Sequence, residues 1–408
     1  MEKRIVIAGA GIAGLAAALS LQARGFPVLV LEQAKELKAL GAGVQLSPNA
    51  TRVLLALGLG DALSRIAVGP GGKLIRLWNT GQTWKLFDLG KDSLERHGAP
   101  YMMLYRPELL QVMVDALQAR APGALRLGAK VVDASQVSSD VTVVLETGEA
   151  IKGEMLIGAD GVHSVVRTKL IAEDQPRFSG CIAWRGVIPV ERLPPSMHGS
   201  EGVNWIGPGG HFIHYPISAG ALVGFTGVVE KEGWFRESWT ESGSVDECGA
   251  DFAGWHEDIH ALIRQVPRPM RWAMMVRDPL TNWSEGRVTL LGDAAHPTLP
   301  FLAQGAGMAI EDGCVLARAV EAHSDNLADA ALAYQNTRIE RTTRIVLESS
   351  ANAKRFHSRE LADPARAEAY VSREWQEGAA RARYEWLFSY EPEAVSLAPP
   401  RGTAAAAH

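Results

Sequence analysis

Three glycines near the start of the chain constrain the fold more than any other feature of the sequence. They follow the pattern Gly9-x-Gly11-x-x-Gly14, between a β-branched apolar run at residues 4–8 and an Ala- and Leu-rich stretch at residues 13–24. This arrangement predicts a buried strand, a tight turn and a helix. In such a unit the first glycine permits the turn, the second lets the backbone approach a pyrophosphate, and the third allows helix and strand to pack closely.

The residues that follow complete a βαβ pattern. Gly25 stops the helix, and a second apolar strand over residues 27–31 ends one residue before Glu32. The dinucleotide-binding fingerprint expects an acid at this point, where it hydrogen-bonds an adenosine ribose, and it uses the helix N-terminus to hold phosphate. The alternative is a Gly-rich turn in an ordinary βαβ unit. The fingerprint itself does not separate NAD from FAD.

Two more segments that contain Gly and Asp lie far downstream. The first is Gly158-Ala159-Asp160-Gly161 followed by His163, Ser164 and Arg167, and the second is Gly292-Asp293-Ala294-Ala295-His296-Pro297 followed by Ala303-Gln304-Gly305-Ala306-Gly307. Together with the fingerprint, their order indicates parts of one flavin-binding site. His163 and Ser164 are equally suited to cap a helix that contains Arg167.

Length, charge and cysteine content exclude several classes of protein. The 408 residues are enough for two or three domains or one large two-lobed enzyme, and a net charge of −5 argues against a nucleic-acid partner. Cys181, Cys248 and Cys314 are far apart and show no metal-type spacing, which fits a reducing cytosol. The first strand begins close to the N-terminus and no apolar run is long enough to span a bilayer. We therefore expect a cytoplasmic protein without a signal peptide, a membrane span or a bound metal.

Hydrophobic periodicity predicts alternating groups of strands and helices. Strands are expected within residues 125–157, 182–189, 211–216, 221–229 and 288–291, and short strands with Gly-rich loops at 68–100. Helices are expected over residues 47–57, 107–120, 245–264, 307–323, 328–355 and 365–388. The chain thus leaves the βαβ unit, builds a β-rich lobe and returns, which places a ligand pocket at the interface.

The order of these motifs resembles that of the class A flavoprotein monooxygenases, the single-component FAD-dependent aromatic hydroxylases. The resemblance covers roughly residues 3–350, and the segments 158–167 and 290–297 are close to the family wording. Residues 299–308 and 183–186 are most similar to the branch of the salicylate hydroxylases and 3-hydroxybenzoate 6-hydroxylases.

The resemblance implies an α/β fold in which a Rossmann-type FAD-binding domain is interleaved with a β-sheet-rich substrate domain and followed by C-terminal helices. The implied parts are a first FAD-binding part with an inserted small sheet region (1–177), a substrate domain (178–283), the return of the FAD-binding domain (284–355), C-terminal helices (356–398) and a disordered tail (399–408).

The resemblance also implies which residues hold FAD. Glu32 binds the adenosine ribose, while Arg106 and Asp293 contact the pyrophosphate and ribityl region. Asp160 helps to position the phosphates and the nicotinamide donor, the segment 41–45 lies along the isoalloxazine, and residues 305–308 lie under its pyrimidine end. The full set is Gly9, Gly11, Ala13, Gly14, Glu32, Gln33, Gly43, Val44, Arg106, Asp160, Gly292, Asp293, Pro300, Gly305, Ala306, Gly307 and Met308.

Several of these residues also have an ordinary structural interpretation. Asp293 follows a buried strand, where a carboxylate needs partners such as ribityl hydroxyls, but it also fits a strand-end cap. Gly305 and Gly307 open a helix whose N-terminus can stabilise the negative charge of reduced flavin, or they serve packing alone. Without the family match, Arg106 fits a surface arginine equally well.

The chemistry of the family defines what the substrate end must provide. NADH or NADPH reduces FAD, reduced FAD and O2 form a C4a-hydroperoxide, and its distal oxygen attacks an electron-rich ring. A phenol reacts best as phenolate, so we expect a base or hydrogen-bond acceptor near the substrate hydroxyl. His211 and Tyr215 are the candidates, because even spacing places both on one face of a strand and His214 on the other. Related hydroxylases carry a His and a Tyr at matching places. The alternative is a pair satisfied by local hydrogen bonds.

Departures from the family pattern bear on the substrate. Position 300 is Pro where the 3-hydroxybenzoate 6-hydroxylases carry a substrate-binding Gln, which favours salicylate. Gln45 and Phe301 stand where the 6-hydroxynicotinate 3-monooxygenases carry His, which argues against a pyridine. We therefore expect conversion of salicylate to catechol with loss of CO2. The alternative is a 3-hydroxybenzoate 6-hydroxylase or a hydroxylase of another phenolic or heteroaromatic acid. Arg185 is a candidate for the carboxylate partner, although a structural arginine fits as well.

Three other hypotheses stay open on the sequence. They are flavin-dependent oxidation of a larger apolar molecule, a non-catalytic flavoprotein, and a dehydrogenase without flavin, which the Gly292-Asp293 segment disfavours. The partners expected for the leading hypothesis are a small aromatic carboxylate, O2 and NAD(P)H. A monomer or a homodimer is expected.

Overall fold

A six-stranded sheet carries the glycine fingerprint and both downstream motifs. The protein is described by a computed structural model over residues 4–37, 42–172, 174–233 and 242–400. The strand order is β17-β18-β11-β1-β2-β7, parallel except for β17. The bounds are β1 Ile5–Ala8, β2 Val28–Leu31, β7 Leu125–Arg126, β11 Met155–Gly158, β17 Ser284–Glu285 and β18 Val288–Leu290. The three motifs and Glu32 each follow one of the four adjacent strands β18, β11, β1 and β2, so the sheet brings them to one edge.

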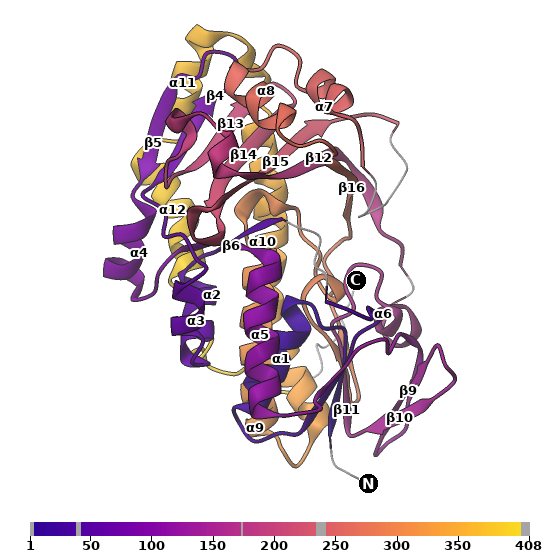
Figure 1. Ribbon diagram of the computed structural model, residues 1–408. Coiled ribbons are helices and arrows are strands. Elements are labelled where there is room, and N and C mark those ends of the chain that lie inside the picture. Colours follow the sequence, from indigo (N-terminus) through magenta and orange to yellow (C-terminus); the bar gives the residue numbers. More distant parts are fainter. Residues whose placement is uncertain (1–3, 38–41, 173, 234–241, 401–408) are drawn as a thin grey trace, which may run out of the picture.

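Helices and two small sheets surround this sheet (Figure 1). The helices are α1 Ile12–Gln22, α2 Pro48–Ala56, α3 Gly60–Ser64, α5 Arg106–Arg120, α6 Val165–Leu170, α9 Gly305–Ala322 and α10 Leu327–Phe356. The small sheets are β8 Val131–Gln136, β9 Val141–Leu145 and β10 Ala150–Gly153, and the pair β3 Gly43–Leu46 and β6 Met102–Tyr105. Gly313 lets α9 approach α1 closely, because a Cβ there would lie 2.6 Å from the backbone nitrogen of Ala17.

A seven-stranded sheet forms the second large layer. Its order is β16-β12-β15-β14-β13-β4-β5, antiparallel except for the parallel pair β13 and β4. The bounds are β4 Lys73–Leu77, β5 Thr83–Phe87, β12 Arg177–Pro189, β13 Gly202–Gly207, β14 Gly210–Ile217, β15 Leu222–Glu230 and β16 Met270–Val276. We expected the β-rich lobe within residues 178–283, but two of its strands come from residues 73–87.

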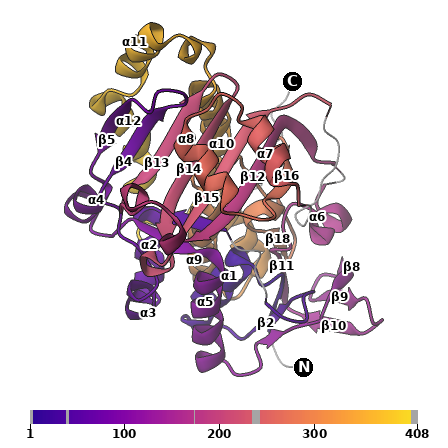
Figure 2. The same ribbon diagram turned by 45° about the horizontal axis from the view of Figure 1, so that its top comes forward.

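The two faces of the large sheet pack against different partners. Helices α7 Val245–Asp251 and α8 Glu257–Arg264 lie over one face (Figures 1 and 2). The aromatic residues packed there include Trp184, Trp205 and Phe212. Because side chains alternate along a strand, the intervening residues point to the opposite face, which borders the cleft described below.

The structure differs from the predicted helices in three places. Residues 68–100 were expected to hold only short strands and loops, but they contain the helix α4 Leu89–His97. The stretch 245–264 is two helices, α7 and α8, and the stretch 365–388 is also two, α11 Pro364–Glu374 and α12 Glu377–Phe388. The disordered tail was expected to begin at Pro399, but Pro399 is placed, and its carbonyl oxygen accepts a hydrogen bond of 3.0 Å from the Asn336 side chain. Residues 401–408 lie outside the described part of the chain. In the part that the structure describes, no helix is long and apolar enough to cross a membrane.

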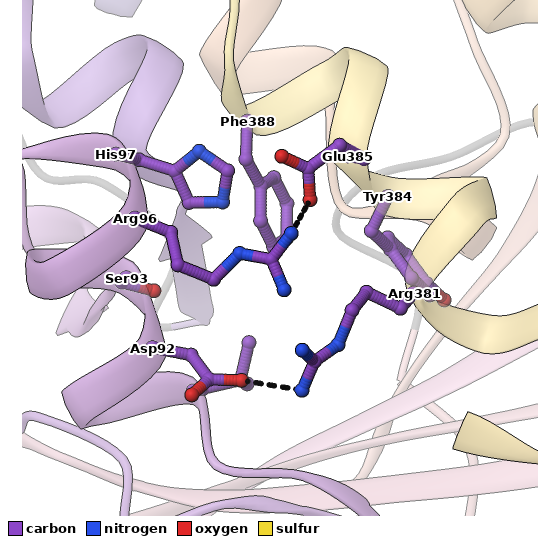
Figure 3. Close-up of a pocket in the computed structure, with 9 residues that line it drawn as sticks. Asp92, Ser93, Arg96, His97, Arg381, Tyr384, Glu385 and Phe388 are labelled. Carbon is purple, nitrogen blue, oxygen red and sulfur yellow. Dashed lines mark hydrogen bonds and ion pairs between the residues drawn. The ribbon is translucent and has the colours of Figure 1, made fainter. Parts of the chain in front are cut away.

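Helix α12 is fastened to α4 by two ion pairs (Figure 3). Arg96 lies 2.8 Å from Glu385, and Arg381 lies 3.0 Å from Asp92. From the same face of α12, the Tyr384 hydroxyl accepts a hydrogen bond of 3.1 Å from the Nζ of Lys73, which lies 4.6 Å from the centre of the Tyr384 ring. The C-terminal helices thus reach β4 of the large sheet.

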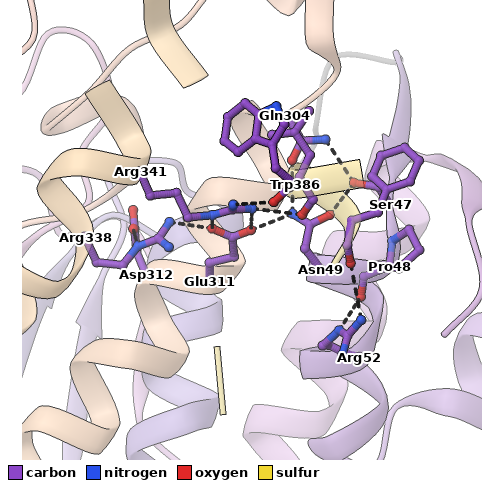
Figure 4. A network of polar contacts seen from close by, with 12 residues as sticks. Ser47, Pro48, Asn49, Arg52, Gln304, Glu311, Asp312, Arg338, Arg341 and Trp386 are labelled. Carbon is purple, nitrogen blue, oxygen red and sulfur yellow. Dashed lines mark hydrogen bonds and ion pairs between the residues drawn. The ribbon is translucent and has the colours of Figure 1, made fainter. Parts of the chain in front are cut away.

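A buried network of charges joins α9 to α10 (Figure 4). Arg338 lies 2.6 Å from Glu311 and 2.8 Å from Asp312, and all three side chains are fully buried. Arg341 adds a second cation at 2.8 Å from Glu311. Burial by itself would raise the pKa of Glu311, but Arg341 and Arg338 outweigh it and hold that pKa below its usual value. Asn49 extends the network from α2 by donating to Glu311 and to the N-cap residue of α9.

Candidate active site

A cleft of about 1570 Å³, including its open mouth, lies between the first sheet and the inner face of the large sheet. The enclosed cavity volume is about 330 Å³, which lies within the roughly 300–1000 Å³ typical of ligand sites. The cofactor side is lined by Gly11, Ile12, Ala13, Gly43, Val44, Arg106, Asp293, Gly305 and Ala306, and the sheet side by Lys73, Arg185, Asn204, His211, Ile213, Tyr215, Thr226, Trp272 and Phe356.

The fingerprint glycines have the geometry that the sequence predicts. Gly9 has a φ of +102°, and a Cβ on it would collide with the carbonyl oxygen of Ala159 after β11. A Cβ on Gly14 would collide with the carbonyl oxygen of Gly9, so only glycine lets α1 start this close to the turn. At Gly11 no atom lies within 4 Å of the position of an added Cβ, and the residue borders the cleft. The loop therefore leaves backbone accessible where a pyrophosphate would approach.

Glu32 is held at the end of β2 by two backbone amides. Its carboxylate accepts hydrogen bonds from the nitrogen of Ala10, at 2.8 Å, and from the nitrogen of Ala34, at 2.9 Å. The acid is thereby fixed beside the fingerprint turn, with acceptor capacity left for a hydroxyl. Gln33, which follows, is exposed.

The second motif caps the start of α6 with its side chains. The Asp160 carboxylate accepts from the Ser164 hydroxyl and, at 2.8 Å, from the backbone nitrogen of Val165. The Ser164 hydroxyl in turn accepts from the nitrogen of Arg167 at 2.9 Å, so the capping role foreseen for Ser164 is confirmed. Burial raises the pKa of Asp160, although these hydrogen bonds oppose the shift. Both neighbours of Asp160 in the sequence border the cleft, whereas its carboxylate is used inside the motif.

Arg167 connects the second motif to the third. Its buried guanidinium donates to the carbonyl oxygens of Ala294, at 3.0 Å, and Ala295, at 3.1 Å. The same group makes hydrogen bonds of 2.8 and 2.6 Å to the Asp174 carboxylate. The turn that carries Asp293 is therefore positioned by an arginine on α6.

Arg167→Met is expected to weaken FAD binding at least about tenfold. The substitution removes charged hydrogen bonds worth about 1.5–3 kcal/mol each, and about 1.4 kcal/mol corresponds to a tenfold change in affinity. The dissociation constant is measured by titrating the apoprotein with FAD and following flavin fluorescence. Arg177→Met is the control, since Arg177 also pairs with an aspartate but is largely exposed. An unchanged affinity for FAD in folded Arg167→Met would contradict this role.

Asp293 and Arg106 provide polar groups that the described residues do not fully satisfy. The Asp293 side chain follows β18, is exposed to the cleft, and has a pKa raised by desolvation against the opposing effect of Arg106. The Nε of Arg106 is buried and has no hydrogen-bond partner among the described residues. With the open backbone at Gly11, these two groups fit the hydroxyls and phosphates of a dinucleotide.

Of the four residues at the start of α9 that were expected to border the flavin, only the first two line the cleft. Gly305 and Ala306 line it, and their amides at the helix N-terminus provide partial positive charge. Gly307 lies closer to Gln304 and Asn49, and Met308 is buried in an apolar cluster. Pro300 borders the cleft, as does Ala303, which has a left-handed φ of 54°. Such a backbone in a residue with a Cβ is typical of functional turns, and no sequence pattern indicated it.

On the sheet side, one row of residues crosses the inner face. Arg185, Thr226, Ile213 and Asn204 stand opposite one another on β12, β15, β14 and β13. The Oδ1 of Asn204 is buried and has no hydrogen-bond partner among the described residues, so it can accept from a bound molecule. Sequence reasoning missed Asn204 and Thr226, because their place next to Arg185 depends on strand pairing across the lobe.

Arg185 is the half-buried cation of this row. Its guanidinium lies 3.5 Å from the centre of the Trp272 ring. Burial, together with Arg106, lowers the pKa of Arg185 to about 9, which leaves it charged at neutral pH. A half-buried arginine stacked on an aromatic ring at the edge of a cleft is well suited to a carboxylate.

His211 and Tyr215 both border the cleft, while His214 points to the other face. His214 is buried beside Arg76, and burial lowers its pKa to about 3. The Nδ1 of His211 lies 2.8 Å from the Nε2 of His357. Burial lowers the pKa of His211 well below its usual value, so the ring is neutral at pH 7. Local hydrogen bonds thus satisfy one nitrogen of His211 and leave Nε2 for the cleft.

Tyr215 packs on the segment 41–45, which the family resemblance assigns to the flavin. A Cβ on Gly43 would lie 2.6 Å from both the hydroxyl oxygen and Cε2 of Tyr215. The Gln45 side chain interacts with Tyr215 and accepts a hydrogen bond of 2.6 Å from the Tyr101 hydroxyl. Burial raises the pKa of Tyr215 to about 12, so it acts as a hydrogen-bonding phenol at neutral pH. Gly41 of this segment lies outside the described residues.

Gly43→Ala is expected to displace Tyr215 and to uncouple hydroxylation from electron consumption. Overpacking of this kind costs about 1–3 kcal/mol, and the ring cannot move without leaving the cleft wall. The measurement is the ratio of hydroxylated product to NAD(P)H consumed, in protein that retains FAD. Gly69→Ala is the control, because no atom lies within 4 Å of its added Cβ. A ratio equal to that of the wild type would show that Tyr215 has no such role.

Comparison with known proteins gives matches over nearly the whole chain. The family described as FAD binding domain matches residues 2–349. The chain is 36% identical over 392 residues to the 3-amino-4-hydroxybenzoate 2-monooxygenase PtnB3 of Streptomyces platensis, covering 96% of this chain and 97% of the relative. It is 39% identical over 351 residues to the 3-hydroxybenzoate 6-hydroxylase 1 of Aquipseudomonas alcaligenes, covering 85% and 87%. The crystal structure of Klebsiella pneumoniae HpxO complexed with FAD and uric acid is similar with a TM-score of 0.80 and 27% identity, over 95% of this chain and 96% of that chain.

Proposed function

The chain belongs to the FAD binding domain family as a class A flavoprotein hydroxylase, and on this basis we propose that it places one oxygen atom on the ring of a hydroxybenzoate, with NADH or NADPH as electron donor. The observation that carries the proposal is the single cleft that joins the fingerprint loop and the start of α9 to the polar inner face of the large sheet. His211, Tyr215 and Arg185 all border that cleft.

Bound FAD supplies electron transfer from the nicotinamide donor and activation of O2. The residues of this chain hold the cofactor and shield the reaction. Glu32 and Gly11 bind the adenosine and pyrophosphate end of FAD, and Arg106 and Asp293 bind the middle of FAD. The amides at the start of α9 stabilise negative charge near the reacting end.

The substrate lies between His211 and Arg185. These residues stand on β14 and β12, with β15 between them and an offset of two residues along the strands, so their backbones are about 12 Å apart, which leaves room for one ring between the side chains. His211 takes the proton of the ring hydroxyl at Nε2, and Arg185 pairs with the carboxylate. Trp272, Phe301 and Phe356 form apolar walls that keep water from the reacting atoms.

Hydroxylation with retention of the carboxylate is the first candidate for the reaction. The relatives at 36% and 39% identity are named for ring hydroxylation of an aminohydroxybenzoate and of 3-hydroxybenzoate. Conversion of salicylate to catechol is the second candidate. The observation that favours it is Pro300, which borders the cleft and offers no side-chain donor to a hydroxyl further round the ring.

Product analysis with a panel of phenolic acids tests the proposal. Salicylate, 3-hydroxybenzoate, 4-hydroxybenzoate and 3-amino-4-hydroxybenzoate are each added to the yellow holoenzyme with NADH or NADPH. We expect one of them to accelerate NAD(P)H oxidation and O2 uptake. Mass spectrometry then distinguishes a gain of one oxygen with the carboxylate retained from loss of CO2. If no phenolic acid in a broader panel changes the rate, the assigned substrate class is wrong.

A further inference from the structure

A line of hydrogen-bonding groups runs from the cleft to the protein surface behind His211. The Nδ1 of His211 lies 2.8 Å from the Nε2 of His357, and the Nδ1 of His357 lies 3.2 Å from the Oε1 of Glu230. Both histidines are 4% exposed, whereas 44% of the Glu230 side chain is exposed. The line therefore begins at a cleft-lining ring and ends at a carboxylate in contact with water.

The carboxylate at the outer end fixes the tautomers of both rings. Glu230 only accepts, so the Nδ1 of His357 must carry a proton and its Nε2 must be an acceptor. The Nδ1 of His211 then has to donate to His357, and the Nε2 of His211 is left as a lone pair directed away from His357. The arrangement thus turns His211 into a neutral base on the side of the cleft.

The described neighbours of His211 other than His357 are apolar and cannot accept a proton, so a proton that leaves His211 away from the cleft can pass only to His357. Phe301 and Phe356 lie with their ring centres 5.0 and 5.1 Å from that of His211, and on the adjacent strands its partners are Val228 and Ile206. The charged groups that face His357 are Glu230 on β15 and Arg359 just beyond α10, which lies 3.0 Å from the second oxygen of Glu230.

The backbone around His357 is tied to the same part of the large sheet. Its carbonyl oxygen accepts from the nitrogen of Gly209 at 3.1 Å, and the carbonyl oxygen of Gly209 accepts from the nitrogen of Glu230 at 2.8 Å. The three side chains are therefore held in register by the turn between β13 and β14 and by the last residue of β15.

We propose that His211, His357 and Glu230 form a proton exit that carries the proton of the substrate hydroxyl to solvent; this rests on the proposed function. The substrate O–H bond breaks as a bond forms from that proton to the Nε2 of His211. The Nδ1 proton of His211 passes to the Nε2 of His357, and the Nδ1 proton of His357 passes to Glu230 and then to water. No electrons are exchanged, and the net change is one phenolate in the cleft and one proton in solution. Both rings again carry their proton on Nδ1 when the steps run in reverse, or when the imidazole rings rotate in the free enzyme.

The first test needs no substrate. In holoenzyme labelled with ¹⁵N-histidine, NMR shows which ring nitrogen of His211 and His357 carries a proton, with assignment from the variants His211→Gln and His357→Gln. We expect protonated Nδ1 and bare Nε2 in both rings, and loss of this preference in Glu230→Gln. A proton on the Nε2 of His211 in the wild type would overturn the proposal.

The second test follows the proton directly. Substrate is mixed with holoenzyme in weak buffer that contains a pH indicator, while the ultraviolet band of the phenolate reports ionisation of the bound ring. Proton release in His357→Gln is expected to slow by about 100-fold, the lower end of what a positioned proton-transfer group contributes. Added imidazole should restore the rate in this variant, whereas a merely structural role for His357 would give no such rescue. Release in Glu230→Gln should also be slowed.

Glu232→Gln is the matched control, since it removes the same charge from an exposed residue two positions beyond Glu230. If Glu230→Gln and His357→Gln both release protons at the wild-type rate, the exit does not exist. Should His357→Gln fail to fold, the half-exposed Glu230 still decides the question. If no phenolic acid binds the wild type, the proposed function fails, and the tautomers seen by NMR still support or overturn the line.

Discussion

His211→Gln is expected to lower kcat/KM for ring hydroxylation by about 10²–10⁴-fold, the range for a positioned general base, while FAD stays bound. Glutamine retains a polar group of similar length but cannot take a proton at neutral pH. The substrate would then be hydroxylated from its less reactive phenol form. The measurement is the steady-state rate of product formation per bound flavin, with the phenolic acid that the panel identifies.

His214→Gln is the matched control for this experiment. It changes the same residue type on the same strand, but on the face that packs under α7 and α8. Product formation per bound flavin should be close to that of the wild type. A small effect in His211→Gln, within about threefold, would rule out the role of His211 as base and would favour a structural pair with His357, since general bases contribute far more than this.

Arg338→Met is expected to destabilise the protein by about 3–5 kcal/mol, the usual cost of removing one partner from a buried ion pair. Two carboxylates, Glu311 and Asp312, would be left in a fully buried site with less positive charge. The free energy of unfolding is measured by urea titration of the holoprotein at constant FAD. Arg366→Met is the control, because Arg366 is largely exposed and pairs only loosely with Asp363, at 3.7 Å.

The pH dependence of the same variant has a defined sign. In the wild type the pKa values of Glu311 and Asp312 are lowered against burial by their cationic partners, so their contribution to stability is present above about pH 4 and is lost as the pH falls through the folded-state pKa. In Arg338→Met we expect these pKa values to rise. The deficit relative to the wild type should therefore be largest at neutral pH and smaller near pH 4. A deficit that does not change with pH would mean that lost packing, not charge, dominates.

The cofactor half of the fold was predictable because its signals are local. The fingerprint glycines, the strand before them and Glu32 lie within 30 residues, and the structure gives each the geometry that the motif requires. Helix α4 was missed although its signals were present, since Asp88 caps its start and Gly98 ends it with a φ of 67°.

The substrate half was less predictable because it depends on distant pairing. Strand β4 pairs with β13, more than 120 residues later, and this register alone puts Lys73 and Asn204 on the cleft side. His357 and His211 are 146 residues apart in the sequence, and their side chains are in contact. His357 follows a helix whose hydrophobic periodicity predicts which residues are buried but not which residues they contact. No local pattern in one sequence encodes either encounter.

The hydrogen bond from Lys73 to Tyr384 has a consequence for how this enzyme could diversify. The matched family region ends at residue 349, and Tyr384 lies beyond it on α12, yet it holds a lysine of the cleft wall. Substitutions in the C-terminal helices could therefore change which ring substituent the enzyme prefers, without any substitution among the residues that line the cleft. A chimera that carries the C-terminal helices of a relative would show directly whether the substrate preference of that relative is transferred with them.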